Sequence, residues 1–589
     1  MAGSTAVTFT SETAPPPPGA GGRAVDGTDA GSRSPWLRWL PFIVAAVYFA
    51  VMMPIGGQMI LQYPDERHYA FGGAQMVETG DWLIPRTPQG EVRLKKPVIP
   101  YWFSAAGFEV LGISVAGFRL FWVIAACGIL LLTYALARAL GATPGVALLA
   151  ELILAANPVF MRAATNSIPD IPLTIFVTLG MLGFVRVIVA PDGESSGRWT
   201  WLGWIGMALA VLTKGLLPLV LVAALAAYVV FAERGRAAAI FRPLPVLAAL
   251  ALVASWYAYA AATHPQDFAA QFFGDQVTGN TTDSAAFVLL AFPGYLASGV
   301  LSFLGWPLLL AWLAVRAGAP LSPARWPSAA RLLAVWCAAV LLVFSFSDAV
   351  DPRYLLPVMP AFAALLAAGI GALDGNGLPR TTRIARWLLV PVAAAGLLLA
   401  VPEALILLQI GSGPALAGLL LGVALWLLAV RIGRRRPRSA PHLLAAMPVL
   451  AAALLALAMA PVVLPERGIP FVAGLAASKV PAGQWAFVGD VHTASEIRLA
   501  AGTAKPIAEY RGVNEALTAG SCLVLTTQPG VARRLESEGF AVEEIRGGWR
   551  EIDPEELFRA IFGWRLERER AAHGVRGYIA TCASEGPSA

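Results

Sequence analysis

The stretch YPDERHYAFGGAQMVETGDWLIPRTPQGEVRLKKPVIPYW, residues 63–102, follows the first long apolar run of the chain. Pro64 followed by two acids is typical of a helix start, because proline suits the first turn and carboxylates favour the positive end of the helix dipole. The stretch also holds aromatic side chains of the kind found at headgroup depth. We therefore expect it to lie along a membrane surface. Its charged residues are Asp65, Glu66, Arg67, His68, Arg86, Arg93, Lys95 and Lys96.

The composition outside this stretch is that of a membrane protein. Of 589 residues, 57% are hydrophobic and only 14% are charged, which is too apolar for a water-soluble protein. The net charge of +6 comes from short basic clusters between apolar runs, so it indicates membrane orientation and argues against nucleic-acid binding. The four cysteines show no zinc-type spacing, and we expect neither a metal nor a cofactor to be required.

Residues 36–464 form the predicted transmembrane part. Thirteen apolar runs reach the ~20 residues that a hydrocarbon core of ~30 Å needs. They begin near residues 37, 115, 145, 170, 199, 216, 243, 287, 329, 354, 387, 414 and 443. Alternate connections carry seventeen arginines, whereas the opposite short connections carry only Arg162, Lys214 and Arg353. The positive-inside rule therefore predicts a cytoplasmic N-terminus and an external C-terminus, in a bacterial inner membrane.

The two ends of the chain differ from this apolar part. Residues 1–35 are rich in Ala, Gly, Ser, Thr and Pro, so we expect a disordered cytoplasmic segment. In residues 465–589, β-like runs such as WAFVGD, SCLVLTT and GYIATC alternate with helical stretches such as ARRLESEG and PEELFRAIFGW. That alternation predicts a small external α/β domain. Cys522 and Cys582 lie near its β-like runs, so we expect a disulfide in an oxidising compartment.

Further charged residues fall at the predicted external ends of spans. Asp170 lies in TNSIPDIPL, Lys214 in LTKG, and Asp348, Asp351, Arg353 and Tyr354 in FSDAVDPRYLLP. Each has a simple structural explanation, such as a helix cap, an interfacial anchor or an exposed ion pair. Their position on one side, together with the charges of residues 63–102, favours a functional site.

Acids and bases at the outer mouth of a bundle suit transfer of a sugar from a lipid phosphate. Lysine and arginine can hold the phosphate while a carboxylate orients or deprotonates the acceptor. A transporter or flippase of a lipid-linked saccharide is the alternative, and it would need charges near the midplane, where Glu403 is the only obvious acid. A membrane scaffold is a third interpretation, but it leaves the external charges without a purpose.

The residues resemble a known family. PDERHYAFGGAQMVETGDWLIPR followed by LKKPVIPYW is similar to the pattern of the aminoarabinose transferase and protein O-mannosyltransferase superfamily, membrane enzymes of the GT-C fold. TNSIPDIPL, LTKGLLPLVL, SWYAYAAATHPQDFAAQFF and DPRYLLPVMPAFAALL follow in the expected order. The resemblance implies a mainly α bundle of about 13 spans with a small external α/β domain. It also implies a glycosyltransferase that uses a polyprenyl-phosphate sugar, with inversion at the anomeric carbon.

The implied acceptor is extracytoplasmic, such as lipid A, a glycolipid, a polysaccharide or a protein. The resemblance assigns catalytic acids to Asp65 and Asp170, and phosphate contact to Lys96. The remaining expected substrate contacts are Glu66, His68, Arg93, Lys95, Lys214, Arg353 and Tyr354. His68 stands where the family usually has arginine, and Arg93 where the aminoarabinose branch often has tyrosine. These departures argue against transferring the lipid A and aminoarabinose specificity to this chain.

Overall fold

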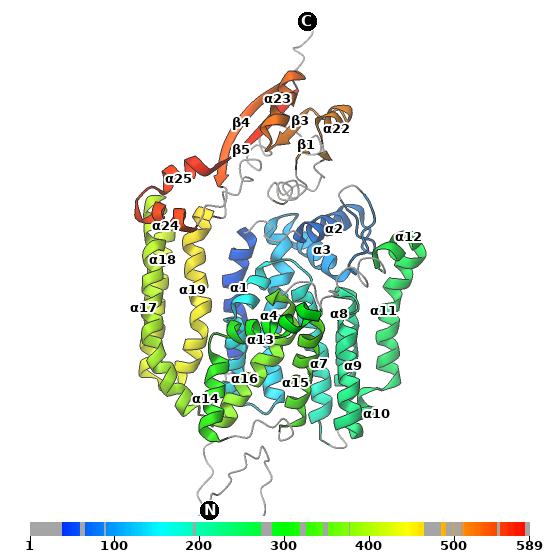
Figure 1. Ribbon diagram of the computed structural model, residues 1–589, viewed down its shortest axis with the longest axis vertical. Helices are drawn as coiled ribbons and strands as arrows, with labels where there is room; N and C mark the ends of the chain where they lie inside the picture. The colour runs from blue at the N-terminus through cyan, green and yellow to red at the C-terminus, as the bar shows by residue number, and fades with distance from the viewer. Residues whose placement is uncertain are drawn as a thin grey trace, which may run out of the picture.

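The computed structural model describes residues 38–58, 65–87, 90–191, 196–272, 285–318, 326–345, 351–375, 377–463, 485–489, 499, 508–510, 512–549 and 554–582. A bundle of long helices carries a small α/β domain at one end (Figure 1). The predicted mainly α membrane bundle with a small C-terminal α/β domain is confirmed. The expected disorder of residues 1–35 and the expected domain boundary at residue 465 lie outside the described residues.

Helices follow one another through the bundle with short connections. Their bounds are α1 (Leu40–Gln58), α2 (Glu66–Thr79), α3 (Ile99–Leu111), α4 (Val115–Ala139), α5 (Pro144–Ala155), α6 (Pro158–Thr165), α7 (Asp170–Val189), α8 (Gly197–Lys214), α9 (Leu217–Ala232), α10 (Ala237–Ile240), α11 (Pro243–Thr263), α12 (Pro265–Phe268), α13 (Ala285–Ser302), α14 (Trp306–Ala317), α15 (Ser328–Phe344), the 3-10 segment η5 (Pro352–Val358), α16 (Met359–Asp374), α17 (Pro379–Gln409), α18 (Gly413–Arg435) and α19 (Ala440–Val463).

Each of the thirteen predicted runs coincides with a helix, but not every helix qualifies as a span. Among the described residues, eight helices are long and apolar enough to cross a membrane, or up to eleven if each sharply bent pair counts once. Helix α15 has only 17 residues, and α8 carries Arg198 and Lys214 near its ends. The count of thirteen therefore stays a prediction.

The bundle is organised around α4, whose Phe118 and Trp122 are fully buried. It packs against α1, α3, α5 and α7. Helices α7 and α8 approach each other closely because glycines face each other across the contact, and small residues let transmembrane helices pack at short range. A Cβ atom at Gly183 would meet the backbone of Gly203. This packing fixes the start of α7 relative to the end of α8.

Helices α2 and α3 lie across the end of the bundle nearest the C-terminal domain (Figure 1). They cross closely at Gly72 and Gly73, where Cβ atoms would collide with Tyr101 and Ser104. Gly80 ends α2 in the left-handed conformation, with φ of 74°. The predicted helix start is confirmed: α2 begins at Glu66, directly after Asp65.

The C-terminal domain contains a five-stranded mixed sheet in the order β2-β1-β3-β5-β4. The strands are β1 (Trp485–Val488), β2 (Ala508–Tyr510), β3 (Leu523–Thr526), β4 (Phe540–Trp549) and β5 (Gly574–Cys582), and the helices are α22 (Val513–Thr518), α23 (Pro529–Ser537), α24 (Pro554–Phe562) and α25 (Leu566–His573). Strands β1, β2 and β3 are parallel, whereas β5 runs antiparallel to β3 and β4. The predicted Cys522–Cys582 disulfide is confirmed, with the two Cα atoms 4.9 Å apart.

Candidate active site

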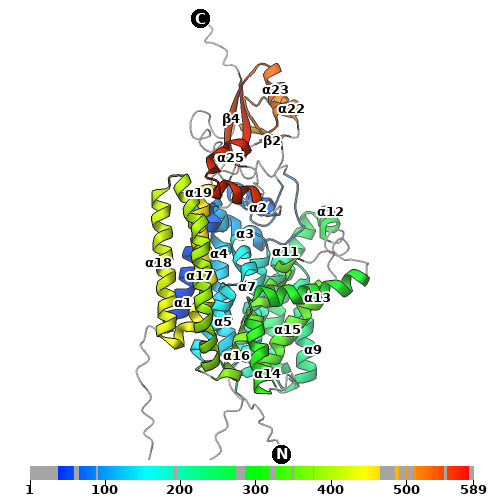
Figure 2. The same ribbon diagram turned by 60° about the vertical axis from the view of Figure 1, so that its left-hand side comes forward.

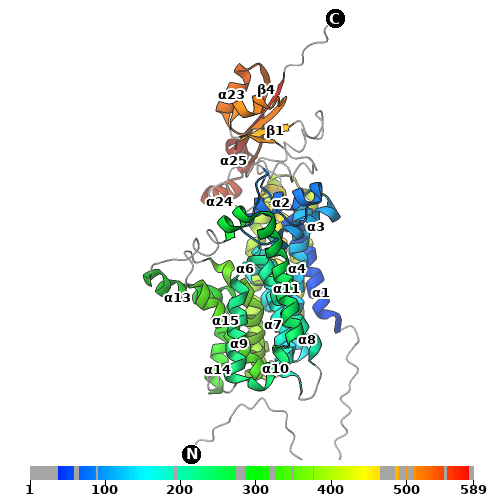
Figure 3. The ribbon, with the colours of Figure 1, turned by 90° about the vertical axis from the view of Figure 1, so that its right-hand side faces the viewer.

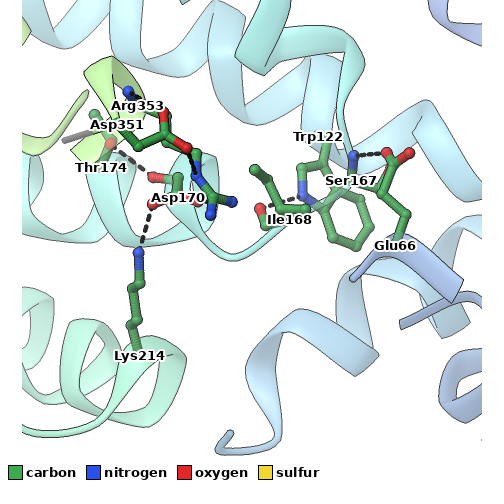
Figure 4. Close-up of polar contacts among 9 residues, drawn as sticks. All are labelled: Glu66, Trp122, Ser167, Ile168, Asp170, Thr174, Lys214, Asp351 and Arg353. Atoms are coloured by element: carbon green, nitrogen blue, oxygen red, sulfur yellow. Dashed lines mark hydrogen bonds and ion pairs between the residues drawn. The ribbon is translucent and has the colours of Figure 1, made fainter. Parts of the chain in front are cut away.

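Asp170 is the centre of a cluster of charges at the start of α7. Its carboxylate is nearly fully buried and accepts from Lys214 Nζ at 2.6 Å (Figure 4). The other carboxylate oxygen lies 3.8 Å from Arg353 Nη1. Three segments far apart in the sequence, at the start of α7, the end of α8 and in η5, thus meet at one acid. Since a buried carboxylate requires such partners, Asp170 fixes the position of both cations.

Arg353 is held from two further directions. Its Nε donates to Asp351 Oδ2 at 2.7 Å, and Asp351 Oδ1 accepts from the Arg353 backbone N–H at 3.1 Å. Asp351 therefore caps η5 and orients the guanidinium at the same time. The ring of Tyr354 lies 5.1 Å from Lys214 Nζ and 5.2 Å from the Arg353 guanidinium carbon, within cation–π range. Both cations remain partly exposed, by 16% and 18% of their side-chain surface.

A second, fully buried network ties α2 to the loop before α7. Glu66 forms an ion pair with Arg119 of α4, and neither side chain is exposed. Glu66 Oε1 also accepts from the Ser167 backbone N–H at 2.6 Å, while Arg119 Nη1 donates to Ser167 Oγ at 3.0 Å. Trp122 Nε1 adds a hydrogen bond to the Ile168 carbonyl at 2.9 Å (Figure 4). The network holds the loop that delivers Asp170.

The placement of Glu66 differs from the expected substrate contact. Its carboxylate is 0% exposed and points into the protein toward Arg119 and Ser167. The residue before it, Asp65, is exposed at the start of α2. In the described part of the chain, Asp65 makes no side-chain capping hydrogen bond. The simple explanation that Asp65 serves as a helix cap is therefore not supported by its geometry.

Lys96 lies within electrostatic reach of both acidic positions. The pKa of Lys96 is lowered from 10.5 to about 8, chiefly by burial and secondly by the nearby charge of Lys214, whereas Asp170 and Asp65 act in the opposite direction. Lys96 therefore lies within Coulombic range of Asp170, Lys214 and Asp65.

The other expected contacts lie along the segment between α2 and α3. His68 and Arg67 are adjacent on α2, with Arg67 Nε 3.4 Å from His68 Nε2. The charge of Arg93 acts on the hydroxyls of Tyr69 and Tyr101, whose pKa values are raised chiefly by burial. Lys95 is half-buried beside Lys96. Asp348 lies outside the described residues.

Gln271 braces the backbone of the segment that carries the lysines. Its side chain accepts from the Leu94 backbone N–H at 2.7 Å and donates to the Val92 carbonyl at 2.9 Å, so it pairs with the backbone as a neighbouring strand would. Trp256 Nε1 of α11 donates to the Leu83 carbonyl at 3.0 Å. The α11–α12 region thus fixes the backbone that presents Arg93, Lys95 and Lys96.

Sequence reasoning missed Arg119, Ser167 and Gln271. Arg119 had a detectable signal, because an arginine inside an apolar run needs a partner. Gln271 had none, since its partners lie 177 and 179 residues away.

The expectation that Glu403 is the only obvious midspan acid was wrong. Glu151 in α5 is also fully buried, and both its carboxylate oxygens lack a hydrogen-bond partner. In the described part of the chain, neither Glu151 nor Glu403 forms an ion pair.

The described residues contain no group of three or more His, Cys, Asp or Glu side chains that could hold a metal ion. The chemistry that they offer is anion binding by lysine and arginine beside free and paired carboxylates.

Comparison with known proteins gives three related findings. Residues 42–263 match the family model described as dolichyl-phosphate-mannose-protein mannosyltransferase. An uncharacterised Aquifex aeolicus protein is 27% identical, over 57% of this chain and 64% of that protein. The undecaprenyl phosphate-alpha-4-amino-4-deoxy-L-arabinose arabinosyl transferase of Aeromonas hydrophila is 30% identical, over 58% of this chain and 61% of that protein. The chain thus aligns with a little under two thirds of the length of these two relatives.

The fold has a counterpart among solved structures. The crystal structure of ArnT from Cupriavidus metallidurans bound to undecaprenyl phosphate matches with a TM-score of 0.64 at 20% identity, covering 93% of this chain and 99% of that one. Its apo structure matches with a TM-score of 0.66 at 18% identity. This likeness shows the fold, and the resemblance predicted from the sequence is confirmed.

Proposed function

We propose, with the resemblance to the aminoarabinose transferase and protein O-mannosyltransferase superfamily as the premise, that this chain is an integral membrane glycosyltransferase. It takes a sugar from a polyprenyl-phosphate donor and transfers it to an extracytoplasmic acceptor. Lipid A, a glycolipid, a polysaccharide and a protein are all acceptors of the right kind. The enzyme lies in a bacterial inner membrane, with the N-terminus cytoplasmic and the C-terminal domain outside.

The single observation that carries this proposal is the convergence of charges at one end of the bundle. Lys214 and Arg353 are fixed by Asp170 and remain partly exposed, and Lys96 lies close enough to interact with both acids. Lysine supplies a mobile point charge, and the arginine fork can grip two phosphate oxygens. Three cations gathered near one acid, at one end of an apolar bundle, suit a lipid phosphate better than a neutral ligand.

In the proposed reaction, Lys96 and Arg353 hold the donor phosphodiester and Lys214 supports them. The bond between the anomeric carbon and the phosphate oxygen breaks, and its electron pair leaves with polyprenyl phosphate. The acceptor oxygen forms the new bond on the opposite face of the sugar, which inverts the anomeric centre. The lysine and arginine side chains stabilise the charge that develops on the leaving phosphate.

Asp65 is the carboxylate proposed to act on the acceptor. It is exposed, whereas Asp170 is buried and bound to two cations. A hydroxyl acceptor loses its proton to Asp65 as the new bond forms, and an acceptor that is already anionic needs the same residue only for orientation. In this proposal Asp170 does not touch the acceptor but positions Lys214 and Arg353. Glu66 likewise has a positioning role, because with Arg119 and Ser167 it holds the loop before α7.

Polyprenyl-phosphate dependence is tested with purified protein, synthetic donor and an envelope extract, by following release of polyprenyl phosphate and labelled product. Mass spectrometry of envelope glycans and glycolipids from cells with and without the protein then identifies the sugar. Loss of one sugar unit supports transfer. Accumulation of an unflipped lipid-linked intermediate, with no transfer in the purified system, would favour the transporter alternative.

A further inference from the structure

The corner between α24 and α25, residues 554–573, exposes three aromatic side chains. Phe558, Phe562 and Trp564 are 61%, 50% and 60% exposed. The two phenylalanine rings contact each other in a tilted arrangement with centroids 4.5 Å apart, so they form one apolar surface. Aromatic rings gathered this way on a surface mark an interaction site, because water solvates them poorly.

This corner is attached to the outer end of a predicted span. Gln409, the last residue of α17, donates to the Ile561 carbonyl at 2.8 Å and accepts from the Leu566 backbone N–H at 3.1 Å. Ile561 and Leu566 are buried against Ile406 of α17. The corner thus lies where a helix of spanning length and composition, Pro379–Gln409, ends.

The position of the α24–α25 corner along the long axis of the molecule agrees with its attachment to the end of α17. Along the long axis of the molecule, α24 lies at the level of α2 and α3 (Figures 1 and 3). Figure 2 shows α24 and α25 between the helical bundle and the sheet. The last turns of α17 expose Val401 and Leu408, as expected of a helix that faces lipid. Because the corner is attached at the end of this helix, its aromatic side chains lie at the depth where tryptophan and other aromatic side chains concentrate in membrane proteins.

Trp564 provides an independent observation. Its φ is +56°, a left-handed conformation that strains a bulky residue and that glycine or asparagine would adopt more easily. The turn itself is closed by the backbone, since Arg565 N–H donates to the Ala560 carbonyl at 2.9 Å. The turn therefore does not require a tryptophan, and its exposed ring points to a use outside the fold.

We propose that Phe558, Phe562 and Trp564 insert into the headgroup region of the lipid bilayer and hold the C-terminal domain against the membrane surface. Arg559 and Glu555 on the same helix form an exposed ion pair, and Arg565, Glu567 and Arg568 are exposed nearby. Charges of both signs surround the rings. The partner is accordingly the interfacial region of phospholipids in general, and anionic lipids are not required.

Depth-dependent quenching tests the proposal in full-length protein reconstituted in liposomes. Cys127 and Cys337 are replaced by alanine, and Cys522 and Cys582 are bonded to each other, so an introduced cysteine is the only reactive thiol. A nitrobenzoxadiazole label is placed at Phe562→Cys, with Arg533→Cys on α23 as the matched exposed control. We expect brominated lipids to quench the label at position 562 several-fold more than the label at 533, and aqueous iodide to show the reverse order.

A second labelling position controls for a label that enters the bilayer without help from the aromatic side chains. The label is moved to the polar position Glu567→Cys and measured with and without Phe558→Ser and Trp564→Ser. Lipid quenching at position 567 should fall at least twofold when the rings are removed. Equal lipid quenching at positions 562 and 533, or no change at 567, would overturn the proposal. A label at 562 shielded from both lipid and iodide would place the rings against a protein partner and also overturn it.

Discussion

At the scale of single residues, the adjacent acids Asp65 and Glu66 show how neighbours in the sequence take opposite roles. Asp65 is exposed, whereas Glu66 points into the core and pairs with Arg119. The sequence predicted that both acids lie at a helix start, because proline followed by two acids is a local signal. The division of roles depends on which way each side chain leaves α2, and the direction of Glu66 depends on Arg119, which α4 places in the core.

Asp65→Asn keeps the shape of the side chain but cannot accept a proton. If the acceptor is a hydroxyl, we expect the transfer rate to fall by about 10²- to 10⁴-fold while donor affinity stays nearly unchanged. Single-turnover transfer and equilibrium donor binding are the two measurements. Glu109→Gln, an exposed acid on α3, is the matched control. An Asp65→Asn variant with the parent rate would remove Asp65 from the chemistry and make Asp170 the acid to test.

Lys96 should make donor binding depend on pH. Its pKa is lowered to about 8, whereas a bound phosphodiester favours the protonated amine and raises that pKa. Donor affinity is therefore greatest below about pH 8 and falls as the pH rises above it. The fall is up to about tenfold per pH unit over the range in which Lys96 is protonated in the donor-bound protein but not in the free protein.

Titration of donor affinity between pH 6.5 and about 9.5 gives the profile. Lys96→Arg should flatten it, because arginine stays charged throughout. Lys96→Ala should weaken donor binding by about 10- to 100-fold below pH 8, since a hydrogen bond to a charged group is worth about 1.5–3 kcal/mol. Unchanged affinity in Lys96→Ala would indicate that the amine only anchors the segment at the interface.

At the scale of elements, the structure joins segments that the sequence could only place on the same side. The start of α7, the end of α8 and η5 were each predicted from local motifs, and their meeting at Asp170 is a packing result. The glycine contact between α7 and α8 explains how two of them come so close. The Glu66–Arg119 pair, 53 residues apart, and the Gln271 brace could not be predicted, because buried partners of this kind have no periodic signature.

The buried pair gives a prediction about how α2 positions the site. Glu66→Met leaves the Arg119 guanidinium buried without its acid, which costs about 3–5 kcal/mol, so a markedly lower melting temperature in detergent is expected. The double variant Glu66→Met, Arg119→Met removes both charges and should recover much of the melting temperature.

The transfer rate of the Glu66→Met, Arg119→Met double variant should nevertheless stay low, because the Ser167 backbone N–H has lost its acceptor and the loop that carries Asp170 is less well held. Melting and kcat are measured on the same preparations. A double variant that regains both the parent melting temperature and the parent kcat would show that the pair serves stability alone.

At the scale of the whole molecule, the site, the α2–α3 layer and the C-terminal domain all lie at one end of the bundle (Figure 1). Composition and span length predicted the membrane bundle, and the change in composition predicted the domain with its disulfide. The count of spans is less well predicted, because short and bent helices such as α5, α14 and α15 can be enclosed by others and need not cross the membrane alone.

Orientation is the last prediction, and the basic connections carry it. Helix α14, which has Arg316 in its last turn, lies at the end of the bundle opposite the C-terminal domain, whereas α23 of that domain exposes Arg533 (Figure 1). With Cys127 and Cys337 replaced by alanine, a membrane-impermeant maleimide should label Arg533→Cys on spheroplasts. It should label Arg316→Cys only after the membrane is permeabilised.

A disulfide supports the same orientation, since Cys522–Cys582 persists in an oxidising compartment and would be reduced in the cytoplasm. Thiol labelling of the unreduced, denatured parent protein should therefore modify Cys127 and Cys337 alone. The reverse labelling order, together with four reactive thiols, would place the charge cluster on the cytoplasmic side. Sugar donors and acceptors would then have to be sought there, and transfer to an extracytoplasmic acceptor would be excluded.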